Sequence, residues 1–404
     1  MVYENKMMGV TMKKFLKKNL PRPVVELIKK QRRKNTFYRN INIDPANEGQ
    51  KRALISYITD PLETNLETFD KHTNVLECAQ IIKTFIDMGF CIDLAHCQDE
   101  RNLPAVLRQE YDVIFGLGFP FYHAGLKNPG ALKIMYLTEA HPDFSVKQEM
   151  ERTQYFYLRH GRKVGLYRSQ THYKKEDIDM ADYAVLVGNE LTAGTYPGLA
   201  GRLSVITPTG LINKRYVFKE RDCARTRKNY VWFGSYGAIH KGLDILIDIF
   251  RQWPDYNLYI CGLYPEEEKL FSITGTNIKN LGFVNVNSDK FLDLVQDCSF
   301  VILPSCSEGM ATSLLTCMNH GLIPVITRET GIDLLDFGFY LDDFRVETVA
   351  RQVKLCSELD IAELERQHRR VFDYSREHFN ISAYSKQFSR ILRGILQDIK
   401  PADS

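Results

Sequence analysis

The chain has 404 residues, of which 44% are hydrophobic and 25% are charged, a composition typical of globular proteins. This length exceeds what one ordinary hydrophobic core holds, so we expect two domains. No run of about 18 apolar residues is present, which argues against a membrane-spanning helix, and the N-terminus lacks the apolar stretch of a signal peptide.

The cysteines bear on redox compartment and metal binding. There are nine, an odd number, with no C-x-x-C pair, and several lie inside apolar runs such as 258–262. This pattern is typical of buried, reduced thiols in a cytoplasmic protein. No spacing of His and Cys resembles a zinc site, so we expect neither a metal nor another cofactor.

The net charge of +3 is unevenly distributed along the chain. Residues 1–40 hold 12 Lys and Arg against two Asp and Glu, whereas the remainder holds 41 basic and 48 acidic residues. We interpret residues 1–50 as a basic N-terminal extension, in which residues 12–40 mix lysines with apolar side chains and could lie on an anionic membrane surface. A solvated terminus is the equal alternative, and the acidic remainder argues against nucleic acid as a partner.

Residues 51–210 alternate short apolar runs with helical stretches and predict a first, acceptor-side Rossmann-like domain. Helical spacing of apolar residues predicts a helix over 74–88, with Gly89 as its left-handed terminating residue. Apolar strands separated by helices predict a parallel sheet covered on both faces. The predicted strands are 52–58, 90–96, 111–118, 132–138, 181–189 and 202–209.

Residues 211–228 are polar, charged and weakly periodic, and we interpret them as a linker. The alternation then restarts over 229–375 and predicts a second doubly wound domain that faces a crevice together with the first. Residues 376–404 predict a helix that packs back on the first domain. The strands predicted in the second domain are 230–234, 257–262, 280–284, 300–304 and 322–327, and helices are predicted at 242–250 and 309–320.

Residues 304–321, "PSCSEGMATSLLTCMNHG", place Glu308 between a predicted strand and a predicted helix that begins at Gly309. The first N–H groups of a helix have no internal partner and, with the helix dipole, favour an anion. The small side chains that follow Glu308 would let a phosphate approach, and Glu308 would accept hydrogen bonds from ligand hydroxyls. The alternative is that Glu308 caps the helix and the small residues permit tight packing.

A second motif, "VWFGSYGAIHKGLD" at 231–244, places Lys241 just before a predicted helix. A lysine at a helix N-terminus opposes the dipole, so an anion between them is one reason for its presence. An exposed loop lysine is the alternative. If both motifs lie at carboxyl ends of strands, their joint target is a diphosphate attached to a hydroxyl-rich group.

Read together, these motifs resemble the C-terminal donor domain of GT-B retaining glycosyltransferases (group 1, family 4-like). The resemblance covers roughly 229–333 and, more weakly, 51–209. It implies that Lys241 binds the donor diphosphate, that Glu308 contacts the donor sugar, and that main chain near 282–284 lines the base pocket. The implied donor-binding residues are Gly234, Ser235, Gly237, His240, Gly282, Phe283, Val284, Gly309, Met310, Ala311, Thr312 and Thr316.

The chain departs from this family pattern at two positions. The family usually has an arginine six residues before the lysine, where this chain has Ser235, and His240, Lys214 or Arg215 could replace that cation. The family also has a second glutamate eight residues after the first, where this chain has Thr316. Both departures bear on nucleotide affinity and leave a non-catalytic binder as an alternative.

In the first domain, the segment 135–144 resembles the family element whose histidine reaches a donor-sugar hydroxyl, and the match falls on His141. Glu139 is a carboxylate with access to the acceptor. His72 and Asn74 are further acceptor-side candidates, although Thr73 or Asn74 could simply cap the following helix. The segment 152–168 mixes tyrosines with arginines and predicts either an acceptor surface or a core helix with a basic edge.

We therefore expect a retaining, metal-independent glycosyltransferase with Lys241, Glu308 and His141 as its catalytic residues. It would move a sugar from a nucleotide sugar to a glycan or lipid-linked acceptor, in cell-surface polysaccharide or glycolipid synthesis, on the cytoplasmic face of a membrane. Lys241 and the helix ends would stabilise the departing diphosphate. The alternatives are a non-catalytic sugar-nucleotide or glycan binder and a sugar-nucleotide epimerase.

Overall fold

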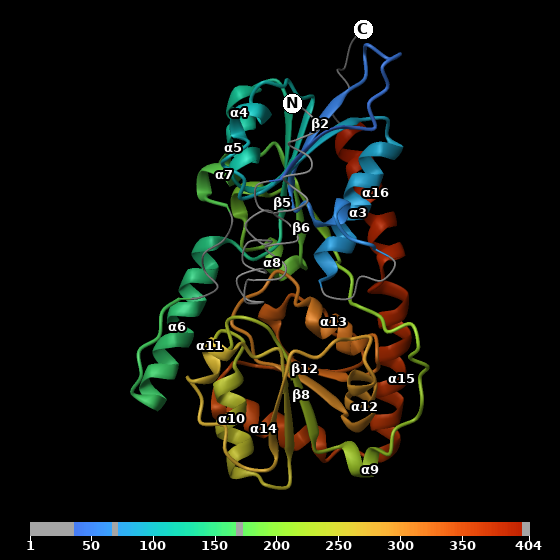
Figure 1. The fold of residues 1–404 in the computed structure, drawn as a ribbon. Helices are drawn as coiled ribbons and strands as arrows, with labels where there is room; N and C mark the ends of the chain where they lie inside the picture. The colour runs from blue at the N-terminus through green and yellow to red at the C-terminus, as the bar shows by residue number, and fades with distance from the viewer. Residues whose placement is uncertain (1–35, 67–71, 167–172, 398–404) are drawn as a thin grey trace, which may run out of the picture. The chain divides into compact units, whose positions relative to one another are not determined.

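The computed structural model describes residues 36–66, 72–166 and 173–397 (Figure 1). The chain forms two compact units: unit 1 comprises residues 1–64 and 85–132, and unit 2 comprises residues 65–84 and 133–404. Most of the basic segment 12–40 lies outside the described residues. In the described part of the chain, no helix is long and apolar enough to span a bilayer. The predicted domain boundaries and the membrane contact stay predictions.

The described residues of unit 1 form four strands in the order β1-β3-β2-β4. They are β1 (Phe37–Ile41), β2 (Arg52–Tyr57), β3 (Cys91–His96) and β4 (Val113–Gly116). The last three are buried, parallel and match the predicted strands. The edge strand β1 runs antiparallel to β3 and was not predicted, because its polar sequence FYRNI is only partly buried. The same unit holds the helices α4 (Leu103–Val106) and α5 (Gly118–Lys127) and the 3-10 turn η1 (Asp60–Leu62).

Helix α3 (Thr73–Asp87) confirms the helix predicted over 74–88. Gly89 follows it with φ +84°, the left-handed conformation expected after a helix end.

Unit 2 contains strands β5 (Leu132–Leu137), β6 (Tyr183–Val187) and β7 (Leu203–Ile206), which pair in this order and in parallel. All three were predicted, because their apolar side chains are buried on both faces of the sheet. The intervening helices are α6 (Pro142–His160), α7 (Lys175–Met180), α8 (Glu190–Ala193) and η2 (Pro197–Leu199).

The same unit holds a six-stranded parallel sheet in the order β10-β9-β8-β11-β12-β13. Its first strand, β8, lies inside the sheet, and the connections change direction between β8 and β11. In open parallel sheets this reversal is where ligands bind. The strands are β8 (Asn229–Phe233), β9 (Asn257–Cys261), β10 (Ile278–Gly282), β11 (Phe300–Leu303), β12 (Ile323–Thr327) and β13 (Phe339–Leu341).

Helices cover both faces of this sheet: α10 packs with α14, and α13 packs with α15 (Figure 1). The helix α10 is buried on most of its surface, including Leu246 and Phe250, so it is a core helix. The helices are α9 (Cys223–Thr226), α10 (Leu243–Gln252), α11 (Pro265–Glu268), α12 (Asp289–Asp297), α13 (Thr312–Met318), α14 (Val346–Ser357), α15 (Ile361–His378) and α16 (Ile381–Gln397), with the 3-10 turn η3 (Arg328–Thr330).

The last helix, α16, contacts the β5–β7 part of unit 2. The hydroxyl groups of Tyr384 and Tyr136 lie 3.0 Å apart, and the Thr207 N–H donates to Gln387 at 3.0 Å. All nine cysteines are free and buried, as the sequence predicted.

Candidate functional site

Lys241 and Glu308 are brought together at the carboxyl ends of β8 and β11, which are adjacent parallel strands. The Lys241 ammonium forms an ion pair with the Glu308 carboxylate, and each side chain is 6% exposed. Ser305 Oγ also donates to Glu308 at 2.9 Å. The two loops can approach this closely because residue 242 is glycine: it has φ +72°, and a Cβ there would lie 2.4 Å from Pro304.

His240 connects the two loops through both its main chain and its ring. Its carbonyl accepts the Cys306 N–H at 3.1 Å, and its Nε2 contacts the Ser307 carbonyl. Its Nδ1 lies 3.4 Å from Cys306 Sγ and 3.6 Å from Glu149. Burial alone would lower the pKa of His240, but Cys306, Glu149 and Glu308 raise it to about 10.

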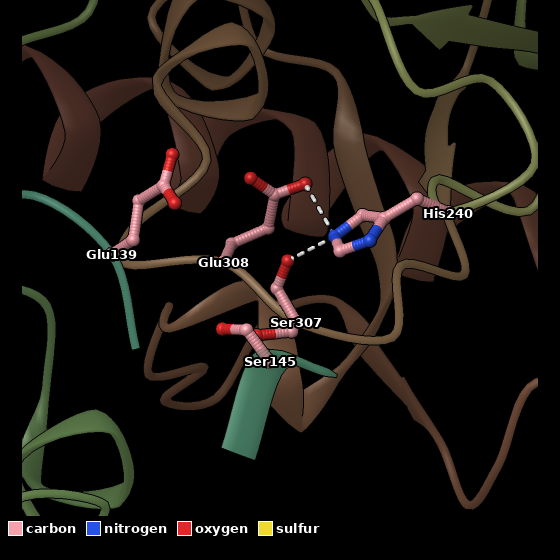
Figure 2. Close-up of a pocket in the computed structure, with 5 residues that line it drawn as sticks. All are labelled: Glu139, Ser145, His240, Ser307 and Glu308. Carbon is pink, nitrogen blue, oxygen red and sulfur yellow. Dashed lines mark hydrogen bonds and ion pairs between the residues drawn. The ribbon is translucent and has the colours of Figure 1, made fainter. Parts of the chain in front are cut away.

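A small pocket lies beside these groups, lined by Glu139, Ser145, His240, Ser307 and Glu308. Figure 2 shows His240 directed toward Glu308 and Ser307, with Glu139 on the far side of Glu308. Ser145 Oγ and Ser307 Oγ are 3.0 Å apart. The sequence linked Glu139 only to the acceptor; the structure places it in one pocket with Glu308.

The helix predicted over 309–320 is shorter than expected. It begins at Thr312, because Ala311 is its N-cap residue in extended conformation and donates its N–H to Thr330 at 3.0 Å. Gly309 and Met310 therefore lie in a loop. Among the described residues, the N–H groups of Met310 and Thr312 have no protein acceptor.

Gly309 is required for packing. A Cβ at this position would lie 2.3 Å from the Thr138 carbonyl oxygen and 2.7 Å from that of Val187. Its own carbonyl accepts a hydrogen bond from Thr192 at 3.2 Å. The alternative that the sequence left open, tight packing around the small residues, thus holds for Gly309.

His141 is the N-cap residue of α6. Its Nδ1 accepts the Asp143 N–H at 3.2 Å, which assigns the ring proton to Nε2 and leaves that nitrogen as a donor. The ring packs edge-on against Tyr196, with centroids 5.2 Å apart. The Tyr196 hydroxyl donates to the Glu139 carbonyl at 2.7 Å and so fixes the main chain just before His141.

Two of the other predicted donor-binding residues are engaged within the fold. The Thr316 hydroxyl is buried; it donates to Thr312 at 2.9 Å and accepts the Leu211 N–H at 3.0 Å. The Gly237 N–H donates to the buried Glu267 carboxylate at 3.1 Å. Both groups therefore have structural partners.

The remaining candidates differ in their exposure. Ser235 is exposed, Phe283 is 69% exposed, and Gly282 ends β10. Gly234 packs against Trp232, and Val284 is buried. His72 is exposed and Asn74 lies in the first turn of α3; neither lines the pocket. Their binding roles stay predictions.

Lys214 and Arg215 were considered as substitutes for the cation absent at Ser235. Lys214 is exposed, and Arg215 pairs with Asp289 at 2.7 Å. In this structure, His240 is the candidate that lies beside Lys241 and Glu308.

Sequence reasoning missed Ser145, Ser307 and the residues Glu149 and Arg152 of α6. One prediction for the segment 152–168 was a core helix whose basic side chains extend into solvent. Arg152 is instead fully buried and paired with Asp244. The i, i+4, i+7 spacing of Ser145, Glu149 and Arg152 marks one helix face, but polar residues at that spacing usually indicate a solvent-facing face. Among the described residues, no group of three or more His, Cys, Asp or Glu side chains could hold a metal.

Part of this sequence matches a known protein family. Residues 227–354 match the family Glycosyl transferases group 1. The sequence has no significant match among curated proteins. Many solved structures share the fold, and three of them are covered over their full length. HepE (Alr3699) of Anabaena, in complex with UDP and glucose, matches 85% of this chain at 13% identity, with a TM-score of 0.56.

The second structure is the lipopolysaccharide outer core galactosyltransferase WaaB, which matches 86% of this chain at 11% identity and a TM-score of 0.56. The third is a sucrose-phosphate synthase of Thermosynechococcus elongatus, with 86% coverage of this chain, 14% identity and a TM-score of 0.54. HepE and WaaB are covered over 100% of their chains, as is the synthase.

The sheets and the site define an α/β protein of GT-B fold, as the sequence predicted. Within this fold, residues 227–354 are similar to the group 1 glycosyltransferases.

Proposed function

We propose that this protein transfers a sugar from a nucleotide sugar to a glycan or lipid-linked acceptor, with retention of configuration and without a metal. The observation that carries the proposal is the buried pairing of Lys241 with Glu308 at the strand ends where the sheet order reverses. Ligands bind at that position in open parallel sheets. UDP is the first nucleotide to test, because HepE was solved with UDP and glucose.

The Lys241–Glu308 pair suggests how donor binding would proceed. A diphosphate would replace the Glu308 carboxylate at the Lys241 ammonium, exchanging one anion for another in a site that is already desolvated. The released Glu308 would accept hydrogen bonds from sugar hydroxyls. His141 Nε2, a donor in this structure, would face another hydroxyl.

During transfer, negative charge develops on the departing diphosphate, and Lys241 would stabilise it as it grows. The N–H groups of Met310 and Thr312 are candidates for further donors. The acceptor would attack from the face that the diphosphate leaves, and a phosphate oxygen would take the acceptor proton. Synthesis of a cell-surface polysaccharide or glycolipid is the setting that we propose.

Release of nucleoside diphosphate from a panel of donors and acceptors tests this function. Lys241→Ala alone leaves a buried carboxylate unpaired and can unfold the site. The informative variant is Lys241→Met with Glu308→Gln, which removes both charges at similar volume. We expect it to remain folded and to lose turnover by about 10²-fold or more.

Lys279→Ala, which removes an exposed lysine of β10, is the matched control and should retain activity. Equal turnover by the double variant and the wild type would contradict the proposal. Saturable donor binding without release under every condition would instead favour the non-catalytic binder.

A further inference from the structure

Helix α6 presents a row of buried polar side chains to the motif loops and α10. Ser145, Glu149 and Arg152 are between 0% and 4% exposed and lie on one helix face. The Ser145 hydroxyl forms a hydrogen bond with Ser307, the Glu149 carboxylate lies beside the His240 ring, and Arg152 forms an ion pair with Asp244. Burying polar and charged groups costs free energy unless they are paired, and apolar residues would pack as well. The row therefore calls for an explanation beyond packing.

The ring of His240 has an acceptor at each nitrogen. Nε2 faces the Ser307 carbonyl oxygen, and Nδ1 lies 3.6 Å from the Glu149 carboxylate. A neutral imidazole donates from one nitrogen only, so its other lone pair would face an oxygen. An imidazolium donates from both. The competing arrangement is a neutral ring whose Nδ1 accepts a hydrogen bond from the Cys306 thiol, with the sulfur 3.4 Å away.

We propose that Glu149 is a positioning residue that keeps His240 in its imidazolium form. In this form, His240 fixes the loop 304–309, and thereby Glu308. It also provides a buried positive charge beside Lys241, in a chain that has Ser235 where the family that the sequence resembles usually has an arginine. The inference rests on the proposed sugar transfer only for its effect on turnover; the protonation of His240 stands independently of it.

The surroundings of His240 support this assignment. Titratable and charged groups reach it from each neighbouring element: Glu149 from α6, Cys306 and Glu308 from the loop after β11, and Lys241 from its own segment. Glu139 lines the same pocket. Burial lowers the pKa of His240, but Cys306, Glu149 and Glu308 together outweigh burial and raise this pKa to about 10.

The direct test follows the imidazole proton resonances of the full-length protein during a pH titration, with His240→Gln to assign the signal. We expect wild-type His240 to remain protonated through neutral pH, and Glu149→Gln to lower its pKa from about 10 toward the ordinary value of 6.5. Glu151→Gln makes the same change at an exposed position of the same helix and should leave His240 unchanged. A wild-type His240 that is neutral at pH 7 would overturn the proposal and favour the Cys306 arrangement, which Cys306→Ala would then alter.

The kinetic test compares pH profiles of kcat/KM. With a His240 pKa of 6.5, only about one in 30 His240 side chains would stay protonated at pH 8. Glu149→Gln should then lose about 30-fold of its activity at pH 8 and recover it below pH 6. Wild type and Glu151→Gln should lack this step. An activity loss in Glu149→Gln that is equal at every pH would show a merely structural role and overturn the proposal. If the wild type transfers no sugar, the proposed function fails, whereas the titration still decides the state of His240.

Discussion

At the scale of single residues, the site is built from charges that are withdrawn from water and neutralise one another. Lys241 and Glu308 are each 6% exposed, and His240 and Glu149 are more deeply buried. Such pairs add little net stability, because desolvation offsets most of the attraction. Removal of one partner nevertheless leaves the other as an unpaired buried charge. Their presence at the strand ends is therefore better explained by ligand binding than by stability.

Glu77 is a buried carboxyl group outside the candidate site, and its titration leads to a prediction about stability. Burial raises its pKa to about 7, and the Thr209 N–H, which donates at 2.8 Å, lowers it only in part. Between pH 4.5 and about pH 7, the folded protein therefore keeps the Glu77 carboxyl group protonated, whereas the unfolded chain has released this proton. Stability from this group is full below pH 4.5 and is lost as the pH rises through 7.

Glu77→Gln should remove this loss, since the amide keeps the oxygen that accepts from Thr209. We expect the variant to match the wild type at pH 4.5 and to exceed it by about 1–3 kcal/mol at pH 8 in denaturant unfolding. Glu377→Gln, an exposed change in α15, should leave the wild-type pH dependence intact. Parallel pH curves for Glu77→Gln and wild type would contradict the prediction.

At the scale of elements, predictability follows the environment of each segment. The buried parallel strands were predicted, because strands covered on both faces are continuous apolar runs. The edge strand β1 was not, because its partly exposed sequence FYRNI lacks that pattern. The late start of α13 depends on the bond from Ala311 to Thr330, which lies beyond the reach of local propensity.

The residues of the site also differ in how well the sequence predicted them. Lys241 and Glu308 were predicted from local motifs at strand ends, where glycine and small residues mark the loops. Glu149 and Ser145 were not, because their role arises from contacts with residues distant in the sequence, and a buried polar helix face looks in sequence like an exposed one.

The loop 304–311 gives a prediction at this scale. Gly309→Ala would place a methyl group against the main chain of Thr138 and Val187, and backbone atoms cannot move aside as a flexible side chain can. We expect a loss of about 1–3 kcal/mol in unfolding free energy. Gly198→Ala, where a Cβ meets nothing within 4 Å, is the matched control and should change stability little. Equal stability of the two variants would show that the loop is not packed as described.

At the scale of the whole molecule, the two chain segments that run between the sheets of unit 2 are in contact with each other and with α13. The Gly210 N–H donates to Phe379 at 3.1 Å, so the two chain segments that run between the sheets are bonded to each other. Asn319, just after α13, donates to the same carbonyl at 3.0 Å. The helix that follows Glu308 is thereby connected to both segments, so a ligand at the site should stabilise unit 2 as a whole.

This coupling makes ligand-dependent unfolding the broadest test of the site. A ligand that binds only the folded state raises its stability by RT ln(1 + [L]/Kd), about 2.7 kcal/mol at 100-fold excess over Kd. We expect one nucleoside diphosphate from a panel of bases to raise the unfolding temperature, and the matching monophosphate, which lacks the second phosphate for Lys241, to raise it less. The Lys241→Met, Glu308→Gln double variant should lose the difference between the two nucleotides while retaining its own folded state. A shift that is the same for mono- and diphosphates in both proteins would place the nucleotide elsewhere, because only a site that contacts the second phosphate can distinguish them.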